Sequence, residues 1–228
     1  CYYLYHNIYL LDETIINEHL CDWIKNELGL LKLYQKLYRI LEEERGAGDF
    51  ILAVFREINY LTHEQFKKLN EELVVLEQLP DVARKKKKGD YLVDNRMFVN
   101  AIRIYEDALR SVDTGGLGGQ YEGEIYHNMG CAYLHLFQMD EAKSCFEKAY
   151  EKLHTKRILK HYLCACRMIM EEAQWQGECA RMGADLETCR EIRKEMESQK
   201  AADSQEKQED IGAVLEKYTK EYHRSTGF

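Results

Sequence analysis

The feature that most constrains this chain is a spacing that occurs twice in its middle. A glycine is followed 12, 16 and 19 residues later by an alanine, an aromatic residue and a second alanine. The copies begin 41 residues apart and consist of Gly89, Ala101, Tyr105 and Ala108, and of Gly130, Ala142, Phe146 and Ala149. Small residues let two helices approach closely, and the aromatic fills the space between hairpins. The spacing therefore predicts two successive helical hairpins.

At these residues, about 82–170, the chain resembles the tetratricopeptide repeat family. The second copy matches best, because its first helix also carries Tyr126, Met129 and Tyr133 at the expected places. A third repeat begins at 157–170, but Gln176 and Gly183 stand where the two alanines of its partner helix should be. We therefore expect the partner helix to fail and the third repeat to be degenerate or a cap.

The rest of the chain also has helical periodicity, and no alternating pattern indicates strands. The fold class predicted is all-α, with stacked antiparallel hairpins that the resemblance implies form a right-handed α-solenoid. Three parts are expected: helices over 1–80, repeats over 81–184, and a helical cap or extension over 185–228. In the first part we predict helices over 12–27, over 30–41, from a cap at Asp49 to Tyr60, and from a capping box at Thr62 and Gln65.

A glycine-rich stretch lies between the two hairpins and consists of Gly115, Gly116, Gly118 and Gly119. The repeat spacing exceeds the usual period of about 34 residues by about 7, and a flexible loop here would absorb the excess. A phosphate-binding loop is not expected, since no strand precedes the stretch and no Lys-Ser or Lys-Thr follows it. A hinge at this place is compatible with a regulator that senses a peptide.

The net charge and the cysteines of the chain limit the classes of partner and the cell compartment that we expect. The formal net charge of -8 argues against nucleic acid, which needs a basic face. No segment is apolar enough to predict a membrane span, and eight scattered cysteines without a CxxC pair favour reduced thiols and a cytoplasmic location. No cofactor is predicted. The sequence starts at Cys1 rather than Met, which leaves open that it is a segment of a longer protein.

The resemblance implies that the first helices of the repeats line a concave groove that holds another protein or a peptide. We therefore predict a non-enzymatic binding scaffold, with an oligomeric state that the sequence leaves undetermined. Repeat register places these residues in the groove: Lys86, Asp90, Val93, Asp94, Glu124, His127, Asn128, Cys131, Leu134 and His135.

One branch of the family holds the free carboxylate of a chaperone tail with lysine and asparagine side chains. Lys86 and Asn128 fit that pattern, but Asp90 replaces one asparagine, and Ile158 and Tyr162 replace the basic pair of the third repeat. A carboxylate beside an anion site is repulsive, so this ligand is not favoured.

The alternative function is a metal-binding or thiol enzyme on the face formed by His127, Cys131 and His135, which recur every four residues. A metal would need a further ligand from Asp94, His161 or Cys164. The simpler interpretation is a semi-polar groove, because no second ligand pair of known spacing is present.

Overall fold

The protein is described by a computed structural model that places residues 1–111, 118–203 and 211–226. Every regular element in these ranges is helical and no strand occurs in them, so the predicted all-α class is confirmed. The chain forms two compact units, Cys1–Ile158 and Leu159–Phe228. Within the described ranges, no helix combines the length and apolar character needed to cross a bilayer.

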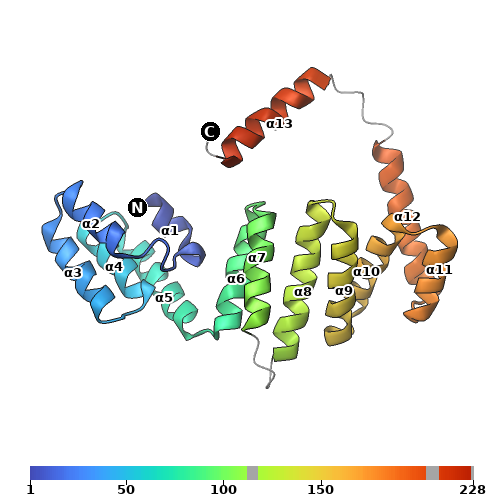
Figure 1. The fold of residues 1–228 in the computed structure, drawn as a ribbon, viewed down its shortest axis with the longest axis horizontal. Helices are drawn as coiled ribbons and strands as arrows, with labels where there is room; N and C mark the ends of the chain where they lie inside the picture. The colour runs from blue at the N-terminus through green and yellow to red at the C-terminus, as the bar shows by residue number, and fades with distance from the viewer. Residues whose placement is uncertain (112–117, 204–210, 227–228) are drawn as a thin grey trace. The chain divides into compact units, whose positions relative to one another are not determined.

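The N-terminal part of the first unit is a set of short helices packed around one core (Figure 1). Leu33, Leu37, Phe50, Ile51 and Phe55 are almost completely buried in that core. The elements are α1 (Tyr2–His6), a 3-10 turn η1 (Ile8–Leu10), α2 (Glu18–Asn26), α3 (Leu31–Glu42), α4 (Ala47–Ile58) and α5 (His63–Gln78).

Side chains that accept the first backbone N–H groups fix where α2 and α4 begin. The sequence prediction for the start of each of these two helices is wrong. The helix expected from Asp12 begins at Glu18, because the Asn17 side chain accepts the Leu20 N–H at 3.1 Å and caps it there. Asp49 does not cap α4. Instead the Glu77 carboxylate, distant in sequence, accepts the Gly48 N–H at 3.1 Å.

The capping box predicted at the start of α5 is confirmed. The Thr62 hydroxyl accepts the Gln65 N–H at 3.2 Å, and the Gln65 side chain accepts the Thr62 N–H at 3.0 Å. These reciprocal bonds satisfy two helix-end donors, which fixes where α5 begins.

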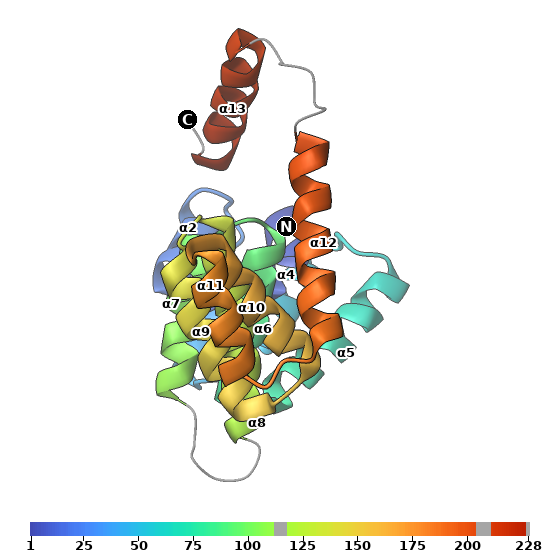
Figure 2. The same ribbon diagram turned by 90° about the vertical axis from the view of Figure 1, so that its right-hand side faces the viewer.

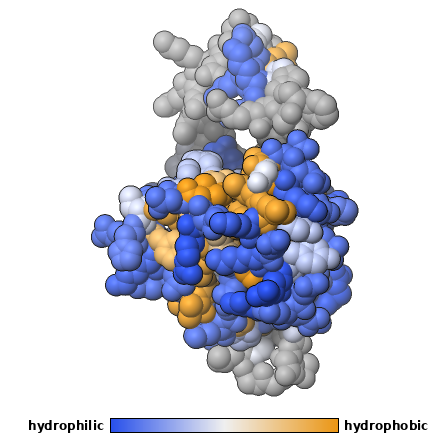
Figure 3. All heavy atoms as spheres, turned by 90° about the vertical axis from the view of Figure 1, so that its left-hand side faces the viewer, coloured by the Kyte–Doolittle hydropathy of each residue, from blue (hydrophilic) through white to orange (hydrophobic). Residues whose placement is uncertain are grey.

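Apolar side chains are also exposed at the α2–α3 end of this unit. Trp23, Leu28 and Leu31 each leave about half of their surface in solvent. Figure 3 shows that hydrophilic residues surround several hydrophobic areas at this end. Most of the hydrophobic surface of α3 is nevertheless buried in the core.

Two helical hairpins follow, and they bear out the predicted repeats. Figure 1 shows α6 (Asp81–Asp94) beside α7 (Phe98–Arg110), and α8 (Gly118–His135) beside α9 (Met139–Leu153). Of the predicted glycine-rich loop, Gly115 and Gly116 lie outside the described residues. Gly118 and Gly119 open α8 and are therefore helical rather than part of a loop.

Each hairpin closes over a glycine at the helix crossing. A Cβ atom at Gly89 would lie 2.3 Å from Cε1 of Tyr105, and one at Gly130 would lie 2.8 Å from Cε1 of Phe146. Tyr105 and Phe146 are both fully buried. The aromatic ring of the second helix thus occupies the space that the missing side chain leaves within its own hairpin, whereas the sequence pattern predicted that ring between hairpins.

The second unit contains most of α10 (Lys156–Ile169), which begins in the first unit, and three further helices (Figure 2). These are α11 (Glu172–Arg181), α12 (Leu186–Asp203) and α13 (Ile211–Thr226). The expectation that no partner helix follows α10 is wrong. Trp175 of α11 is fully buried and donates its indole N–H to the Leu163 carbonyl at 2.9 Å, so a large ring replaces the alanines.

The glycine crossing generates a stability prediction. Gly89→Ala forces the Tyr105 ring to move, and overpacking of this kind costs about 1–3 kcal/mol in the free energy of unfolding. Urea denaturation measures this loss. Gly119→Ala is the control in the same unit, because a Cβ there has no neighbour within 4 Å, and its effect should stay below about 1 kcal/mol. Equal losses for both variants would contradict the packing role of Gly89.

Candidate functional site

A groove of about 960 Å³ lies in the first unit where α6, α8 and the turn between α9 and α10 meet. Most of its lining residues have polar side chains, and two are aliphatic. The lining residues, called the groove from here on, are Lys86, Gly119, Gln120, Glu124, His127, Asn128, Lys152, Leu153, Thr155, Arg157 and Ile158.

The groove contains four of the ten residues predicted for it: Lys86, Glu124, His127 and Asn128. Asp90 reaches two of them through hydrogen bonds. The lining does not include the other predicted residues, Val93, Asp94, Cys131, Leu134 and His135. His135 is exposed and stacks on Phe98 of α7, with ring centroids 4.4 Å apart and planes 5° apart. The C-terminal end of the predicted surface therefore does not line the groove.

The Asp90 carboxylate organises the wall of the groove. Its Oδ1 accepts a hydrogen bond from the Tyr105 hydroxyl and one from the Asn128 amide, both at 2.7 Å. Its Oδ2 accepts a bond from Lys86 Nζ at 2.8 Å. One carboxylate thus connects α6, α7 and α8 and neutralises the nearest cation. Burial and the neighbouring Asp90 charge raise the pKa of the Tyr105 hydroxyl, so it stays a donor.

This network explains why a chaperone-tail carboxylate is a poor fit. The two side chains that match that branch of the family, Lys86 and Asn128, both donate to Asp90. Lys86 also lies 3.5 Å from Glu124, and only 16% of its side chain is exposed. The Asp90 carboxylate already accepts hydrogen bonds from the two donors that an incoming carboxylate would use. The expected repulsion is thus accompanied by direct competition for both donors.

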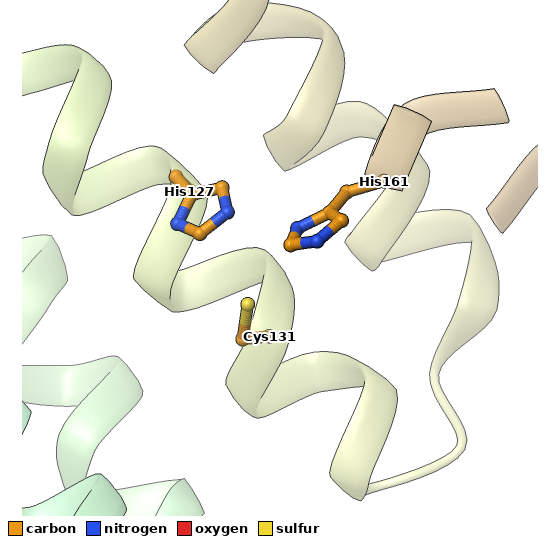
Figure 4. Close-up of side chains that lie close together, drawn as sticks. All are labelled: His127, Cys131 and His161. Atoms are coloured by element: carbon orange, nitrogen blue, oxygen red, sulfur yellow. The ribbon is translucent and has the colours of Figure 1, made fainter. Parts of the chain in front are cut away.

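His127 and Cys131 project from the same side of α8, one turn apart (Figure 4). His127 is buried, with its Nδ1 atom 3.1 Å from the Asn128 side-chain oxygen and its ring centroid 5.7 Å from that of Phe146. Burial lowers the pKa of the His127 imidazole and raises the pKa of the Cys131 thiol. Both groups are therefore held in their neutral forms.

Of the proposed His/Cys/His face, His127 and Cys131 stay close together, with their ligand atoms within 4.8 Å of each other, but His135 lies apart from them. Among the described residues, His135 belongs to no group of three potential metal ligands. Asp94 is exposed, and His161 and Cys164 lie on α10 in the second unit. Burial raises the pKa of the Cys164 thiol to about 11, so this thiol is protonated in the metal-free chain.

Sequence reasoning missed the part of the groove after α9. Lys152, Leu153, Thr155 and Arg157 enter it because His154 adopts a left-handed conformation (φ 48°, ψ 34°) and ends α9 there. Asparagine and histidine tolerate this conformation better than most residues, but it leaves no strong sequence signal. Arg157 could have been predicted from the sequence. It directly precedes Ile158, which the repeat register places on the first helix of the third repeat.

The fold and the groove define a helical-repeat protein with a polar groove on the first helices of its hairpins. Residues 123–151, which form most of α8 and α9, match the family described as Tetratricopeptide repeat. This match confirms the predicted resemblance at the second hairpin. No curated protein gives a significant match to the chain.

The Asp90 network predicts a specific loss of stability. Asp90→Ala leaves the buried Tyr105 hydroxyl without its acceptor and should lower the free energy of unfolding by about 1–3 kcal/mol. In a chain that already carries Tyr105→Phe, the Asp90→Ala change should lower the free energy of unfolding by clearly less, because the two residues are coupled. Asp94→Ala, at an exposed position one turn away, should cost less than about 0.5 kcal/mol. Additive losses for Asp90 and Tyr105 would show that the hydrogen bond contributes nothing.

His127 predicts a pH dependence. Its pKa is lowered from 6.5 in the folded chain, so the unfolded chain takes up the proton more readily. The contribution of the neutral His127 to the stability of the fold is complete above pH 6.5 and is lost as the pH falls toward the lowered pKa. Denaturation between about pH 7.5 and about pH 5.5 should therefore show a smaller decrease in stability for His127→Gln than for the original chain. His63→Gln, at an exposed position, should keep the original profile.

Proposed function

We propose that the chain is a non-enzymatic binding module that holds a segment of another protein in the groove. The observation that carries this proposal is the groove itself, about 960 Å³ in volume and formed by the first helices of the repeats. That volume lies toward the upper end of the range for ligand sites, roughly 300–1,000 Å³. Helical repeats present extended surfaces of this kind to peptides.

The lining suggests the chemistry of the bound segment. Gln120, Asn128 and Thr155 offer hydrogen-bonding side chains, while Leu153 and Ile158 offer an apolar surface. Two of the three cations already have counter-ions. Lys86 pairs with Asp90 and Glu124, and Lys152 lies 2.8 Å from Glu122.

Arg157 is the remaining cation of the groove. It is exposed, and it makes no ion pair with any residue in the described ranges. A segment that carries a carboxylate next to an aliphatic side chain would pair with Arg157 and cover the partly exposed Leu153. We therefore propose an acidic–aliphatic peptide segment as the ligand.

The state of the thiol and imidazole on α8 supports binding rather than nucleophilic catalysis. A Cys/His pair reacts when the thiol pKa is lowered and an imidazolium stabilises the thiolate. Burial does the reverse here: it raises the pKa of the Cys131 thiol and lowers the pKa of the His127 imidazole. A reducing compartment such as the cytoplasm is part of the proposal, since eight cysteines are scattered over the chain.

Site-specific crosslinking tests where a partner binds. A photoreactive amino acid is introduced at position 120, which lines the groove. In the control it replaces Glu106, which is exposed on α7. Crosslinks to one partner from position 120, and none from position 106, are expected. Equal crosslinking from both positions would contradict the groove as the binding site.

A matched pair of arginine variants tests the role of Arg157. Arg157→Ala should weaken binding of the crosslinked partner by about tenfold, because a charge-assisted hydrogen bond is lost. Arg103→Ala removes the same charge from an exposed position on α7 and should leave the affinity unchanged. Fluorescence anisotropy with the labelled partner segment measures both. Equal affinities for the two variants would remove the carboxylate from the proposal.

A further inference from the structure

A second pocket of about 550 Å³ lies in the first unit between α3, α4 and α5, in the part of the chain that the repeat match does not cover. It has an aliphatic wall and a polar rim. The lining residues, called the basic pocket from here on, are Gln35, Lys36, Arg39, Ile40, Arg45, Asp49, Leu52, Ala53, Arg56 and Asn70.

The basic pocket has a charge opposite to that of the chain. Its lining carries four cationic side chains and one carboxylate, whereas the whole chain has a formal net charge of -8. Like charges gathered in a concave site repel one another and raise the local concentration of anions. The helices α3 and α4 concentrate this charge because their apolar sides are buried in the core and their basic residues border it.

One of the four cations is held in place by acidic residues. Arg45 lies between α3 and α4, and its guanidinium donates to Asp49 Oδ2 through Nε and lies 2.7 Å from the same oxygen through a terminal nitrogen. Glu43 is 3.8 Å away. Arg45 is therefore positioned and largely neutralised, so that it forms a fixed edge of the basic pocket.

The other three cations have no counter-ion among the residues that the structure describes. Lys36 and Arg39 lie one turn apart on α3, and neither side chain forms an ion pair within the described ranges. Arg56 near the end of α4 makes no ion pair there either, and its guanidinium lies 5.5 Å from the centre of the Phe66 ring. Three exposed cations that no described residue neutralises therefore surround one cavity.

We propose that the basic pocket binds a compact anion that carries two or more adjacent phosphate groups. Guanidinium groups match phosphate oxygens with paired hydrogen bonds, and the lining supplies such groups from two helices and the segment between them. The Gln35 and Asn70 amides can add neutral donors, and Ile40, Leu52 and Ala53 keep one wall apolar. A pocket of this volume suits a small molecule, roughly 300–1,000 Å³.

A long nucleic acid is the weaker fit for the same residues. Duplex binding needs a basic face that follows many phosphates, whereas this charge is confined to one cavity in an acidic chain. The recognised chemistry is therefore a local cluster of negative charge.

Calorimetric titration of the whole chain with inorganic pyrophosphate, in metal-free buffer of low ionic strength, tests the proposal. Pyrophosphate should bind at least about tenfold more tightly than inorganic phosphate, because it can engage more than one cation at once. The double variant Arg39→Gln/Arg56→Gln should weaken pyrophosphate binding by at least about tenfold. Both replaced side chains are exposed, and the thermal unfolding midpoint should show that the variant stays folded.

The matched control is Lys32→Gln/Lys67→Gln, which removes the same charge from exposed positions on α3 and α5 outside the lining. It should keep the original affinity for pyrophosphate. Three results would overturn the proposal: no binding of pyrophosphate, equal affinity for pyrophosphate and phosphate, or equal weakening in the control. If the double variant unfolds, Arg39→Gln alone provides the comparison, since no ion pair within the described ranges depends on it.

Discussion

The packing of Tyr105 against Gly89, together with its hydrogen bond to Asp90, is the interaction on which the repeat part of the structure depends. The ring occupies the space that the glycine leaves, and the hydroxyl bonds to the carboxylate one residue further along α6. The same carboxylate binds Lys86 and Asn128. The buried Tyr105 thus sets the separation of two helices, and the Asp90 carboxylate that it binds orients two residues of the groove.

The second hairpin uses the same packing without the polar network. Phe146 fills the space beside Gly130 but has no hydroxyl, and α8 carries the buried His127 nearby. The aromatic ring therefore provides the separation of helices in both hairpins, while only the first hairpin couples it to a charged group. The difference makes the α6 side of the groove electrostatically fixed and leaves Arg157, on the other side, as the cation available to a ligand.

The two cavities of the first unit differ in what they can bind. In the groove, most charges are already paired, so hydrogen bonding and apolar contact dominate, which suits a protein segment. In the basic pocket, three of four cations lack counter-ions in the described part of the chain, so electrostatic attraction dominates, which suits a small anion. Neither cavity shares a lining residue with the other. Two separate ligands are therefore physically compatible on one unit.

The sequence by itself determined the helical class, the two hairpins, the Thr62 capping box and four groove residues, because helix periodicity, caps and glycine–aromatic spacing are properties of short stretches. Only the tertiary structure decided that the Asp90 carboxylate accepts hydrogen bonds from Lys86 and Asn128 and that Glu77 caps α4. It also decided that α3, α4 and α5 enclose a basic pocket. These contacts join residues from separate helices, as Glu77 and Gly48 show. No local pattern specifies which distant side chain fills such a place, since packing of the whole core selects it.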